Sequence, residues 1–379
     1  MELTVDQSAL SRALRLVARV APARPTLPIL QMVLLAAEPG RLRLTATDAE
    51  LALNTVVAAD VAAEGRVAIP ARLLGDYVAQ LPGEPVRLTF EPQRQRVRAA
   101  CGPFVAALAT ADPDEFPAFP STDERAALEL DAGRLRTAIE RVAFAAARDE
   151  SRPVLAGVLF DFGADGLTLA AADGFRLARA RLPEATAAPQ QLLVPARAVA
   201  ECARLLADAE AARLLPAPDG RGVALMAGAS VLYSRLIEGQ FPDVERVIPR
   251  DARTRVTVET AAFAQAVRVA GLFGSGDARP VLLEAAPDRL RLQARGAESG
   301  EAESELPAAL EGEPQAVALN TRLLADLLGA VAGARLELRW ASPQAPVVVR
   351  EADRPEETDL WVVMPLYDPA LARRQAQAA

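Results

Sequence analysis

The most informative property of this sequence is what it lacks. Among its 379 residues there is no histidine, and all 42 basic residues are arginine, so lysine is absent as well. Without lysine there is no phosphate-binding P-loop and no Schiff-base chemistry. Without histidine there is no Ser-His-Asp triad and no imidazole-ligated zinc. Catalysis would therefore have to depend on carboxylates, alone or with a hard metal ion.

Three carboxylates near repeated turns are the candidates for such catalysis: Asp48, Glu50 and Asp173. They leave open a carboxylate-metal hydrolase that acts on nucleic acid. Aspartate at these positions more often shapes an Asp-Gly-type turn, because its side chain bonds the backbone two residues on. We therefore expect a protein that is not an enzyme and that uses neither a cofactor nor a metal ion.

Cysteine and long apolar runs are scarce too. Cys101 and Cys202 stand far apart and offer neither a disulfide framework nor a metal-ligand spacing, so we interpret them as small buried hydrophobes. The apolar runs fall short of the roughly 18 residues that a membrane-spanning helix needs, and the start, MELTVDQS, is polar. These features predict a soluble, cytoplasmic protein.

What the chain does contain is a repeat. Arg-Pro pairs open similar stretches at Arg24, Arg152 and Arg279, spaced by 128 and 127 residues. The markers Pro70-Ala71-Arg72, Pro195-Ala196-Arg197 and Asn320-Thr321-Arg322 are spaced by 125 residues. A period this long suits whole domains rather than the roughly 20 to 50 residues of a solenoid unit. Proline-rich acidic segments near Thr122 and Asp251 mark the boundaries, which gives domains 1–122, 123–251 and 252–379, with a tail from about 367.

Within each domain the elements also come in pairs. The stretch from Ser151 to Arg179 contains an apolar strand, a turn at Asp165-Gly166, a return strand and a second turn at Asp173-Gly174. A short strand and an amphipathic helix precede it, and a second helix follows the Pro-Ala-Arg marker. Each domain therefore consists of two βαβββ-like halves of about 60 residues, an α+β architecture with helices on one side and sheets on the other.

Arginines recur along the first helix of two repeats. Asp6 can cap a helix with Leu10, Leu14 and Val17 on its inner face, and Arg12, Arg15 and Arg19 form a stripe on the opposite face. In the second repeat Arg134, Arg141 and Arg148 lie on a common line. The net charge is −8, whereas duplex-binding domains are usually basic, but one face can be basic on an acidic molecule. A solvated helix face explains a single stripe equally well; repetition favours a shared functional surface.

Five separated segments of the sequence carry a resemblance to a known family: RPTLPIL, TATDAELAL, AADGFRLA, SRLIEGQFPDVERVIP and VVMPL. Together they resemble the bacterial replicative sliding clamp, the β subunit of the DNA polymerase III holoenzyme, over essentially the whole chain. The resemblance implies a non-catalytic processivity factor. Two copies would join head to tail in a ring, each forming half of it, with helices lining the hole around duplex DNA and sheets outside. We expect contact without sequence preference from arginines at markers and helix ends: Arg24, Arg72, Arg148, Arg152, Arg197 and Arg279.

The resemblance also implies an apolar groove for a short peptide carried by the polymerase catalytic subunit, the clamp loader, other polymerases and repair proteins. Its residues would be Leu155, Ala172, Gly174, Phe175, Arg176, Leu177, Pro242, Arg246, Val247, Val362, Val363, Met364, Pro365 and Leu366. Arg176 and Arg246 could donate hydrogen bonds to peptide carbonyls or to an acidic flank. Ala172 and Phe175 replace the threonine and histidine that family members often carry, so the groove is less polar here. The same residues could instead be ordinary core.

For the contact between copies we expect Phe104 and Leu108 from the first domain, and Leu272 and Phe273 from the third. Edge strands that meet across this boundary would continue the sheet and cover unpaired backbone groups. Packing within each domain is the alternative for these four residues. A further alternative for the whole chain is a protein-interaction scaffold that binds peptides and no DNA.

Overall fold

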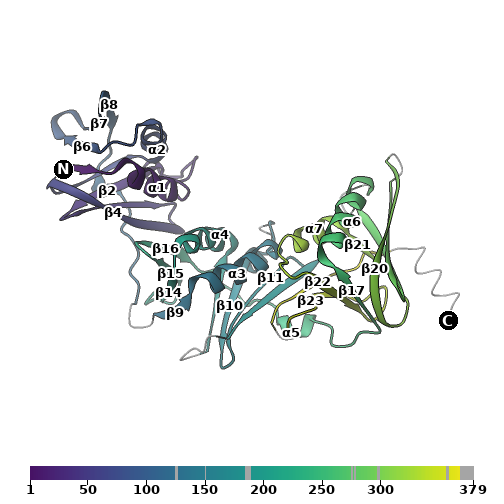
Figure 1. Ribbon diagram of the computed structural model, residues 1–379. Helices are drawn as coiled ribbons and strands as arrows, with labels where there is room; N and C mark the ends of the chain where they lie inside the picture. Colours follow the sequence, from purple (N-terminus) through teal and green to yellow (C-terminus); the bar gives the residue numbers. More distant parts are fainter. Residues whose placement is uncertain are drawn as a thin grey trace. The chain divides into compact units, whose positions relative to one another are not determined.

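The computed structural model describes residues 1–123, 127–149, 151–183, 189–274, 276, 279–296, 299–355 and 358–367. One pattern, strand-helix-strand-strand-strand, occurs six times in order along the chain (Figure 1). Pairs of this pattern make up each third of the sequence, so the predicted βαβββ halves are confirmed. The remaining helix, α5 (Val244–Val247), is a single turn that precedes the last third.

The elements have the following bounds. In the first third they are β1 (Glu2–Val5), α1 (Gln7–Val17), β2 (Met32–Glu38), β3 (Arg41–Thr47), β4 (Leu51–Ala63), β5 (Gly65–Pro70), α2 (Ala71–Gln80), β6 (Val86–Glu91), β7 (Arg96–Cys101) and β8 (Phe104–Ala109). In the second third they are β9 (Leu128–Asp131), α3 (Ala132–Val142), β10 (Gly157–Gly163), β11 (Gly166–Ala172), β12 (Arg176–Leu182), β13 (Gln190–Pro195), α4 (Ala196–Leu205), β14 (Ala211–Pro216), β15 (Gly222–Ala227) and β16 (Ser230–Arg235). In the last third they are β17 (Thr254–Glu259), α6 (Thr260–Phe273), β18 (Pro280–Ala286), β19 (Arg289–Gly296), β20 (Gly300–Gly312), β21 (Ala316–Asn320), α7 (Thr321–Leu328), β22 (Arg335–Trp340), β23 (Val347–Glu351) and β24 (Leu360–Val363).

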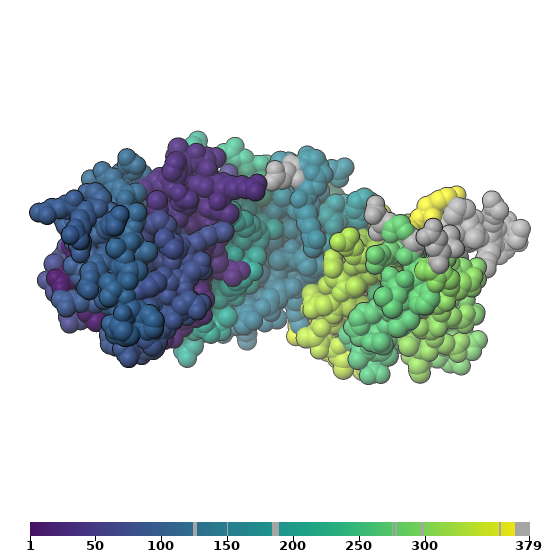
Figure 2. Space-filling model, turned by 90° about the horizontal axis from the view of Figure 1, so that it is seen from above, coloured from purple at the N-terminus to yellow at the C-terminus, as the bar shows by residue number. Residues whose placement is uncertain are grey.

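Contacts divide the chain into two compact units. Unit 1 contains Met1–Gly133 and Glu201–Leu236, and unit 2 contains Arg134–Ala200 and the described residues from Ile237 onward. The middle third is thus shared: β9 and β14 to β16 belong to unit 1, and β10 to β13 belong to unit 2. In Figure 2 the purple to dark blue surface of residues up to Gly133 belongs to unit 1, and the surface from green to yellow after Leu236 belongs to unit 2.

Each unit is built on one antiparallel sheet. The unit 1 sheet runs β8-β7-β6-β1-β4-β16-β15-β14-β9, with β3, β2 and β5 branching from β4. The unit 2 sheet runs β13-β10-β11-β12-β24-β23-β22-β17-β20-β19-β18-β21. In unit 1, α1 packs on α2 and on β3 and β4; in unit 2, α6 packs on α7 and on β19 and β20. Helices therefore cover one face of the sheet in each unit (Figure 1).

Local sequence explains the helix starts. The Asp6 carboxylate accepts a hydrogen bond from the Ala9 N–H at 2.8 Å, and Leu10, Leu14 and Val17 are buried, as predicted. At α7 the Asn320 side chain caps in the same way, accepting from the Arg322 N–H at 2.9 Å. Three leucines of α7 then face the core. Burial of these apolar stripes, rather than helix propensity, holds such short helices in place.

The strand registers correct one feature of the predicted repeat. Met32 pairs with Pro70, and Gly157 pairs with Pro195, so the two repeats are related by a shift of 125 residues. Under this shift the short 3-10 helix that starts at Pro153 corresponds to the one that starts at Pro28. The interpretation of Arg24-Pro25 as the equivalent of Arg152-Pro153 was therefore wrong. The residue of the first repeat that is equivalent to Pro153 is Pro28, not Pro25, because Pro28 and Pro153 each start the 3-10 helix that precedes a strand.

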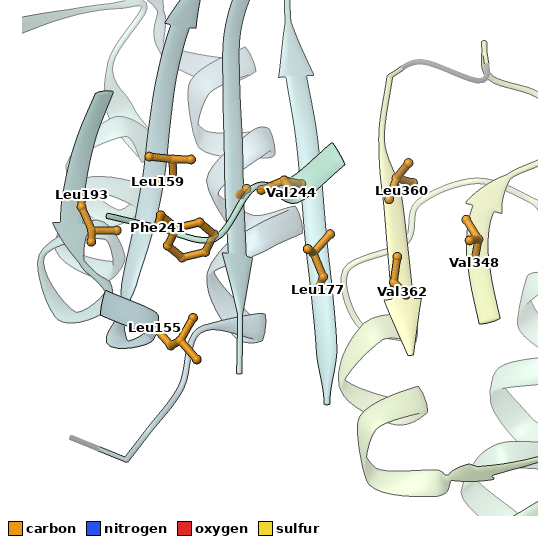
Figure 3. Packing of buried hydrophobic residues seen from close by; sticks show 10 residues of the cluster. Leu155, Leu159, Leu177, Leu193, Phe241, Val244, Val348, Leu360 and Val362 are labelled. Carbon is orange, nitrogen blue, oxygen red and sulfur yellow. The ribbon is translucent and has the colours of Figure 1, made fainter. Parts of the chain in front are cut away.

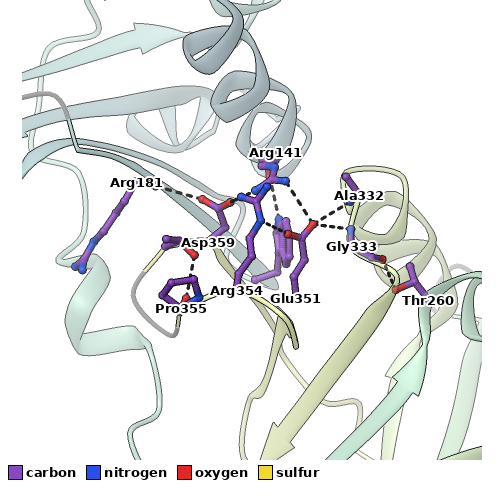
Figure 4. A network of polar contacts seen from close by, with 11 residues as sticks. Arg141, Arg181, Thr260, Ala332, Gly333, Glu351, Arg354, Pro355 and Asp359 are labelled. Atoms are coloured by element: carbon purple, nitrogen blue, oxygen red, sulfur yellow. Dashed lines mark hydrogen bonds and ion pairs between the residues drawn. The ribbon is translucent and has the colours of Figure 1, made fainter. Parts of the chain in front are cut away.

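The predicted arginine stripe of the second repeat is wrong as well. Helix α3 ends at Val142, so Arg148 lies beyond it. Arg141 is buried, and Figure 4 shows its guanidinium between the carboxylates of Asp359 and Glu351. The Trp361 Nε1–H donates to the Arg141 carbonyl at 2.9 Å. Burial lowers the pKa of Arg141, while the Glu351 charge acts in the opposite direction. The sequence could not reveal this role, because both carboxylates come from more than 200 residues away.

Candidate functional site

The two segments of the expected peptide groove lie side by side. Strand β12 pairs with β24 in antiparallel register, with Arg176 opposite Val363 and Leu177 opposite Val362. At the end of this pair the Met364 N–H donates to the Phe175 carbonyl at 2.8 Å. Residues almost 190 positions apart thus form one continuous edge.

The two strands contribute Leu177 and Val362 to a buried hydrophobic cluster, which Figure 3 shows. Of the expected groove residues, Leu155, Leu177 and Val362 are buried members of this cluster, and Ala172 packs against it. Val363 is fully buried too. For these residues the core interpretation holds, and they form the floor of any groove. The packing of these buried residues holds β12 and β24 in position, and the exposed residues Phe175 and Met364 lie at the ends of these strands.

The accessible part of the expected groove is a rim of larger side chains. Phe175 is 66% exposed, Val247 43% and Met364 38%. Pro242 and Arg246 are exposed, and Pro365 and Leu366 are partly exposed. Phe175 and Met364 are neighbours, because their backbones are hydrogen-bonded, and adjacent exposed apolar side chains on buried supports are typical of a docking site.

A turn projects Phe175 outward. Gly174 has a φ of 91°, a left-handed conformation that glycine adopts without strain. The Asp173 carboxylate accepts hydrogen bonds from the N–H groups of Phe175 at 2.9 Å and Arg176 at 3.0 Å. Asp48 does the same for Glu50 and Leu51 in the first repeat, at 3.0 and 2.7 Å. These carboxylates therefore shape turns, as the non-catalytic interpretation predicted.

Arg176 is held by residues of this chain. Its guanidinium bonds Asp173 at 2.9 Å and Asp326 at 2.7 Å, and it lies over the ring of Phe144 at 5.2 Å from the centroid. With its side chain buried, Arg176 ties the turn to α7 rather than pointing into solvent. Arg246 differs, because its side chain is exposed and bonded to Asp243 at 3.0 Å.

A cavity of about 750 Å³ adjoins the rim on the side of α7. It brings together Leu155, Gly174, Phe175 and Arg176 from the expected groove with Arg148 and Arg152, which we had expected at DNA. Sequence reasoning missed its α7 wall: Arg322, Leu323 and Asp326. Arg322 belongs to a repeated marker, but nothing in the sequence placed this helix beside the Gly174 turn.

The first repeat contains an equivalent edge with different chemistry. Strand β4 pairs with β16, and the Arg235 N–H donates to the Glu50 carbonyl at 2.9 Å, just as Met364 does to Phe175. Here the rim positions carry a carboxylate and a guanidinium. An apolar rim is therefore a property of the β12-β24 edge and is not shared by its counterpart.

The remaining candidate arginines are on the surface. Arg24, Arg72, Arg197 and Arg279 are all exposed, and Arg72 and Arg197 stand in the first turns of α2 and α4. Arg12 and Arg15 are exposed on α1. Arg279 has a φ of 35°, and its carbonyl accepts hydrogen bonds from the Thr321 N–H and hydroxyl. The backbone at Arg279 thus connects the start of β18 to α7.

The candidates for contact between copies fall into two classes. Phe104, on the edge strand β8, is 50% exposed, and Leu272, near the end of α6, is 76% exposed. Phe273 is partly exposed, whereas Leu108 is buried. The core interpretation therefore holds for Leu108 and not for Phe104 or Leu272.

Among the described residues, no group of three or more cysteine and carboxylate side chains stands close enough to hold a metal ion. No helix in this part of the chain is long and apolar enough to cross a bilayer. Cys101 is buried and Cys202 is partly buried, and desolvation raises the pKa of the Cys202 thiol to about 12, which disfavours its thiolate form.

Comparison with known proteins gives one consistent result. Sequence models of the DNA polymerase III beta subunit match residues 1–120 (N-terminal domain), 129–243 (central domain) and 245–367 (C-terminal domain). The chain is 33% identical over 374 residues to the beta sliding clamp of Caulobacter vibrioides, covering 97% of this chain and 100% of that one. It is 32% identical over 375 residues to the beta sliding clamp of Synechococcus elongatus, covering 97% and 99%.

Solved structures agree. A sliding clamp from Pseudomonas aeruginosa, bound to griselimycin, superposes with a TM-score of 0.92 at 29% identity, covering 97% of this chain and 100% of that one. The beta sliding clamp of C. crescentus gives 0.89 at 33% identity, with the same coverage.

Proposed function

Because this chain belongs to the family of the DNA polymerase III β subunit, the bacterial β sliding clamp, we propose that two copies of it form a closed ring around duplex DNA. Members of this family are non-catalytic, and the chain is a processivity clamp that binds DNA and clamp-binding partners. The ring, its contact residues and the named partners below are our proposal. We place its action in the cytoplasm, where a bacterial chromosome lies.

The arrangement of three modules, 1–122, 123–251 and 252–379, supports a ring. The fourth strand of the first module, β4, pairs with the last strand of the second, β16. The fourth strand of the second module, β12, pairs with the last strand of the third, β24. By the same rule β20, the fourth strand of the last module, should pair with a strand equivalent to β16 and β24. That strand is β8, in the first module of a second copy.

Both edges are open for such pairing in the described residues: β8 pairs only with β7, and residues 300–306 of β20 pair only with β19. The register follows from equivalent positions. Ala46, Ala171 and Ala294 pair with Leu53, Ala178 and Ala302. On the other side, Leu53 pairs with Leu232 of β16, and Ala178 pairs with Trp361 of β24. The residue of β8 at the equivalent position is Ala106. We therefore propose that Ala302 of one copy lies opposite Ala106 of the other.

Two such contacts close a symmetric head-to-tail dimer, because each copy supplies both edges. Pairing would cover backbone groups that edge strands otherwise expose, and it would bury the apolar side chains of Phe104 and Leu272. Phe273 would contribute from the end of α6, and Leu108 from below, as part of the core that supports β8.

For DNA we propose the exposed arginines Arg24, Arg72, Arg197 and Arg279, with Arg12 and Arg15 on α1. A closed ring holds DNA by topology, so a few phosphate contacts suffice and tight binding would hinder sliding. The net charge of −8 is compatible with this role, since acidic groups more than about 8 Å from the DNA are largely screened at physiological salt. Arg148 and Arg152 lie in the cavity beside the groove, and we assign them to that site.

The rim of Phe175, Val247 and Met364 is our proposed docking site for short peptides of the polymerase catalytic subunit, the clamp loader, other polymerases and repair proteins. Flexible methionine and branched side chains can fit several related anchors. The single observation that carries the proposal is the pairing of β12 with β24. It brings two family-like segments that are distant in the sequence together into one apolar edge.

Retention on DNA of different topology tests the ring. The protein would be loaded with a clamp loader onto nicked circular DNA, separated from free protein, and the DNA then linearised. We expect retention on circles and loss after cutting. Retention that ignores the cut would indicate ordinary DNA binding, and a protein that never stays on circles would indicate a peptide-binding scaffold.

A further inference from the structure

We propose that the C-terminal tail, residues 368–379, lies across the outer face of β18, β19 and β20, the sheet face opposite α6. The tail lies outside the described residues, and the family match ends before it, at residue 367. Its position is inferred from the residue at which it starts and from the two linkers, 112–122 and 238–251, which lead from one module to the next.

One hydrogen bond is repeated in all three thirds of the chain. A backbone N–H donates to a strand carbonyl in each: Ala111 to Ala68 at 2.9 Å, Ile237 to Leu193 at 2.8 Å, and Leu366 to Ala318 at 2.8 Å. The three carbonyls are spaced by 125 residues and lie on the equivalent strands β5, β13 and β21. The chain after Leu366 therefore starts where the two linkers start.

The second linker crosses the outer face of its module along one row of paired residues. From β13 to β12 this row is Leu193, Leu159, Ala170 and Arg179. Phe241, four residues after Ile237, packs in the cluster that contains the apolar part of the row (Figure 3). Glu245, eight residues after Ile237, bonds Arg179 at 2.6 Å. The linker thus covers the row from end to end.

The last module contains the corresponding row. From β21 to β20 it is Ala318, Leu282, Gln293 and Glu303. Leu282 is partly exposed. In the first linker Phe116 follows Ala111 by five residues and is buried against Ala68. Leu371 follows Leu366 by the same five residues and is the large apolar side chain of the tail, so we place it over Leu282.

The charges at the far end of the row are exchanged between the two modules. Arg374 follows Leu366 by eight residues, and Glu303 stands at the position of Arg179. Glu303 bonds Arg291 at 2.6 Å but is 50% exposed, so it can accept a second guanidinium. Glu245 already holds two, those of Arg179 and Arg181. The ion pairs across β18, β19 and β20 join four glutamates and three arginines, which leaves one negative charge for the tail.

The tail has the length for this path. Eight residues span up to about 26 Å, whereas three strand spacings from β21 to β20 amount to about 14 Å. At this point the second linker contacts the next module, since Val244 packs with Val362 of β24. By the same path the tail supports the joint of β20 with β8 of a second copy. This consequence alone rests on the proposed ring.

Cysteine crosslinking tests the position of the tail within one chain. In full-length protein with Cys101→Ala and Cys202→Ala, Arg374→Cys would be combined with Glu303→Cys or with Glu311→Cys. Glu311 is exposed on the same strand, about 26 Å further along. We expect the pair at 303 to form a disulfide within one copy about tenfold faster than the pair at 311, measured by mass spectrometry after digestion. Equal rates, or disulfides only between copies, would overturn the inference.

A further substitution in the crosslinking protein tests the apolar contact. Leu371→Ala should slow the disulfide of the pair at 303 about tenfold, because the truncation removes apolar area that the sheet covers. Gln377→Ala, further along the tail, is the matched control and should leave the rate unchanged. A rate that does not respond to Leu371→Ala would contradict the contact with Leu282.

Truncation after Tyr367 tests the support of the joint. Loss of residues 368–379 should speed subunit exchange between labelled dimers about tenfold and leave the affinity of the rim for an apolar peptide unchanged. An unchanged exchange rate would overturn the support, and tighter peptide binding would place the tail in the rim instead. An unmodified protein that is monomeric would overturn the proposed ring, whereas the crosslinks would still decide where the tail lies.

Discussion

The Met364 N–H donates to the carbonyl of Phe175 at 2.8 Å, and this bond ends the β12-β24 pair where both side chains become exposed. Two residues from distant parts of the chain thus form adjacent points of one apolar rim. Their supports are buried, so the rim is held in place before any partner arrives. Prior ordering of this kind reduces the entropy that a bound peptide must lose.

The rim predicts the effect of shortening its side chains. Met364→Ala with Leu366→Ala should weaken binding of an apolar clamp-binding peptide at least tenfold, because each truncation removes apolar area worth roughly 1 to 2 kcal/mol when covered. Anisotropy with a labelled peptide measures this loss. Leu27→Ala, at a side chain 58% exposed elsewhere, is the control and should leave affinity unchanged. Unchanged affinity in the double variant would show that the rim is not the docking site.

Much of this architecture could be predicted from sequence, because it depends on local patterns. Residues close together in the sequence indicate the 125-residue period, the caps at Asp6 and Asn320, and the turn at Asp173-Gly174. What the sequence could not supply was long-range pairing. The sequence pattern placed Arg141 in a surface stripe, but its carboxylate partners are Glu351 at the end of β23 and Asp359, the residue before β24. Arg322 and Asp326 were missed for the same reason, since only the fold brings α7 to the turn.

The apolar contact proposed between copies can be tested with a matched pair of surface changes. Phe104→Arg should shift the protein from dimer to monomer, because a charge would be buried in the joint. Light scattering coupled to gel filtration measures the mass directly. Phe175→Arg alters a still more exposed aromatic residue, which lies in the groove, and it should leave the dimer intact. A dimer in both variants would place the contact elsewhere.

The proposed DNA surface predicts a salt-sensitive defect. Arg72→Gln with Arg197→Gln should reduce loading onto circular DNA most at low salt and should flatten the dependence of loading on salt concentration, since each lost phosphate contact lowers the slope by about one unit. Arg94→Gln, at an exposed arginine outside the proposed surface, provides the comparison. Identical salt dependence in all three proteins would mean that Arg72 and Arg197 do not face DNA.

The buried ionic network should be costly to break. Arg141→Met leaves the carboxylates of Asp359 and Glu351 buried with fewer partners, so we expect a loss of about 3 to 5 kcal/mol in unfolding free energy. Trp340 and Trp361 both belong to unit 2, so tryptophan fluorescence during urea unfolding follows that unit. Arg136→Met, in the exposed pair with Glu140 on the same helix, should cost less than about 1 kcal/mol. Equal effects would contradict the buried role of Arg141.

Glu38 gives a prediction for acid. Hydrogen bonds from Arg43 first, and from Arg41, lower its pKa from 4.5 to about 2. A depressed carboxyl pKa stabilises the fold above pH 4.5, and this stabilisation is lost as the pH falls toward 2. The stability difference between the unmodified protein and Glu38→Gln should therefore be about 1 kcal/mol at neutral pH and shrink below pH 4.5. Urea unfolding at several pH values measures it, and a difference independent of pH would contradict the assignment.

The closed ring itself is tested most directly by a covalent lock at its proposed joint. In a background with Cys101→Ala and Cys202→Ala, the pair Ala106→Cys and Ala302→Cys should oxidise to a disulfide between copies, because residues opposite in adjacent strands are close enough to bridge. Rings loaded on circular DNA and then oxidised should remain on the DNA in detergent and leave after the DNA is cut. Locked dimers that detergent strips from intact circles, or cysteines that never join two copies, would contradict the ring.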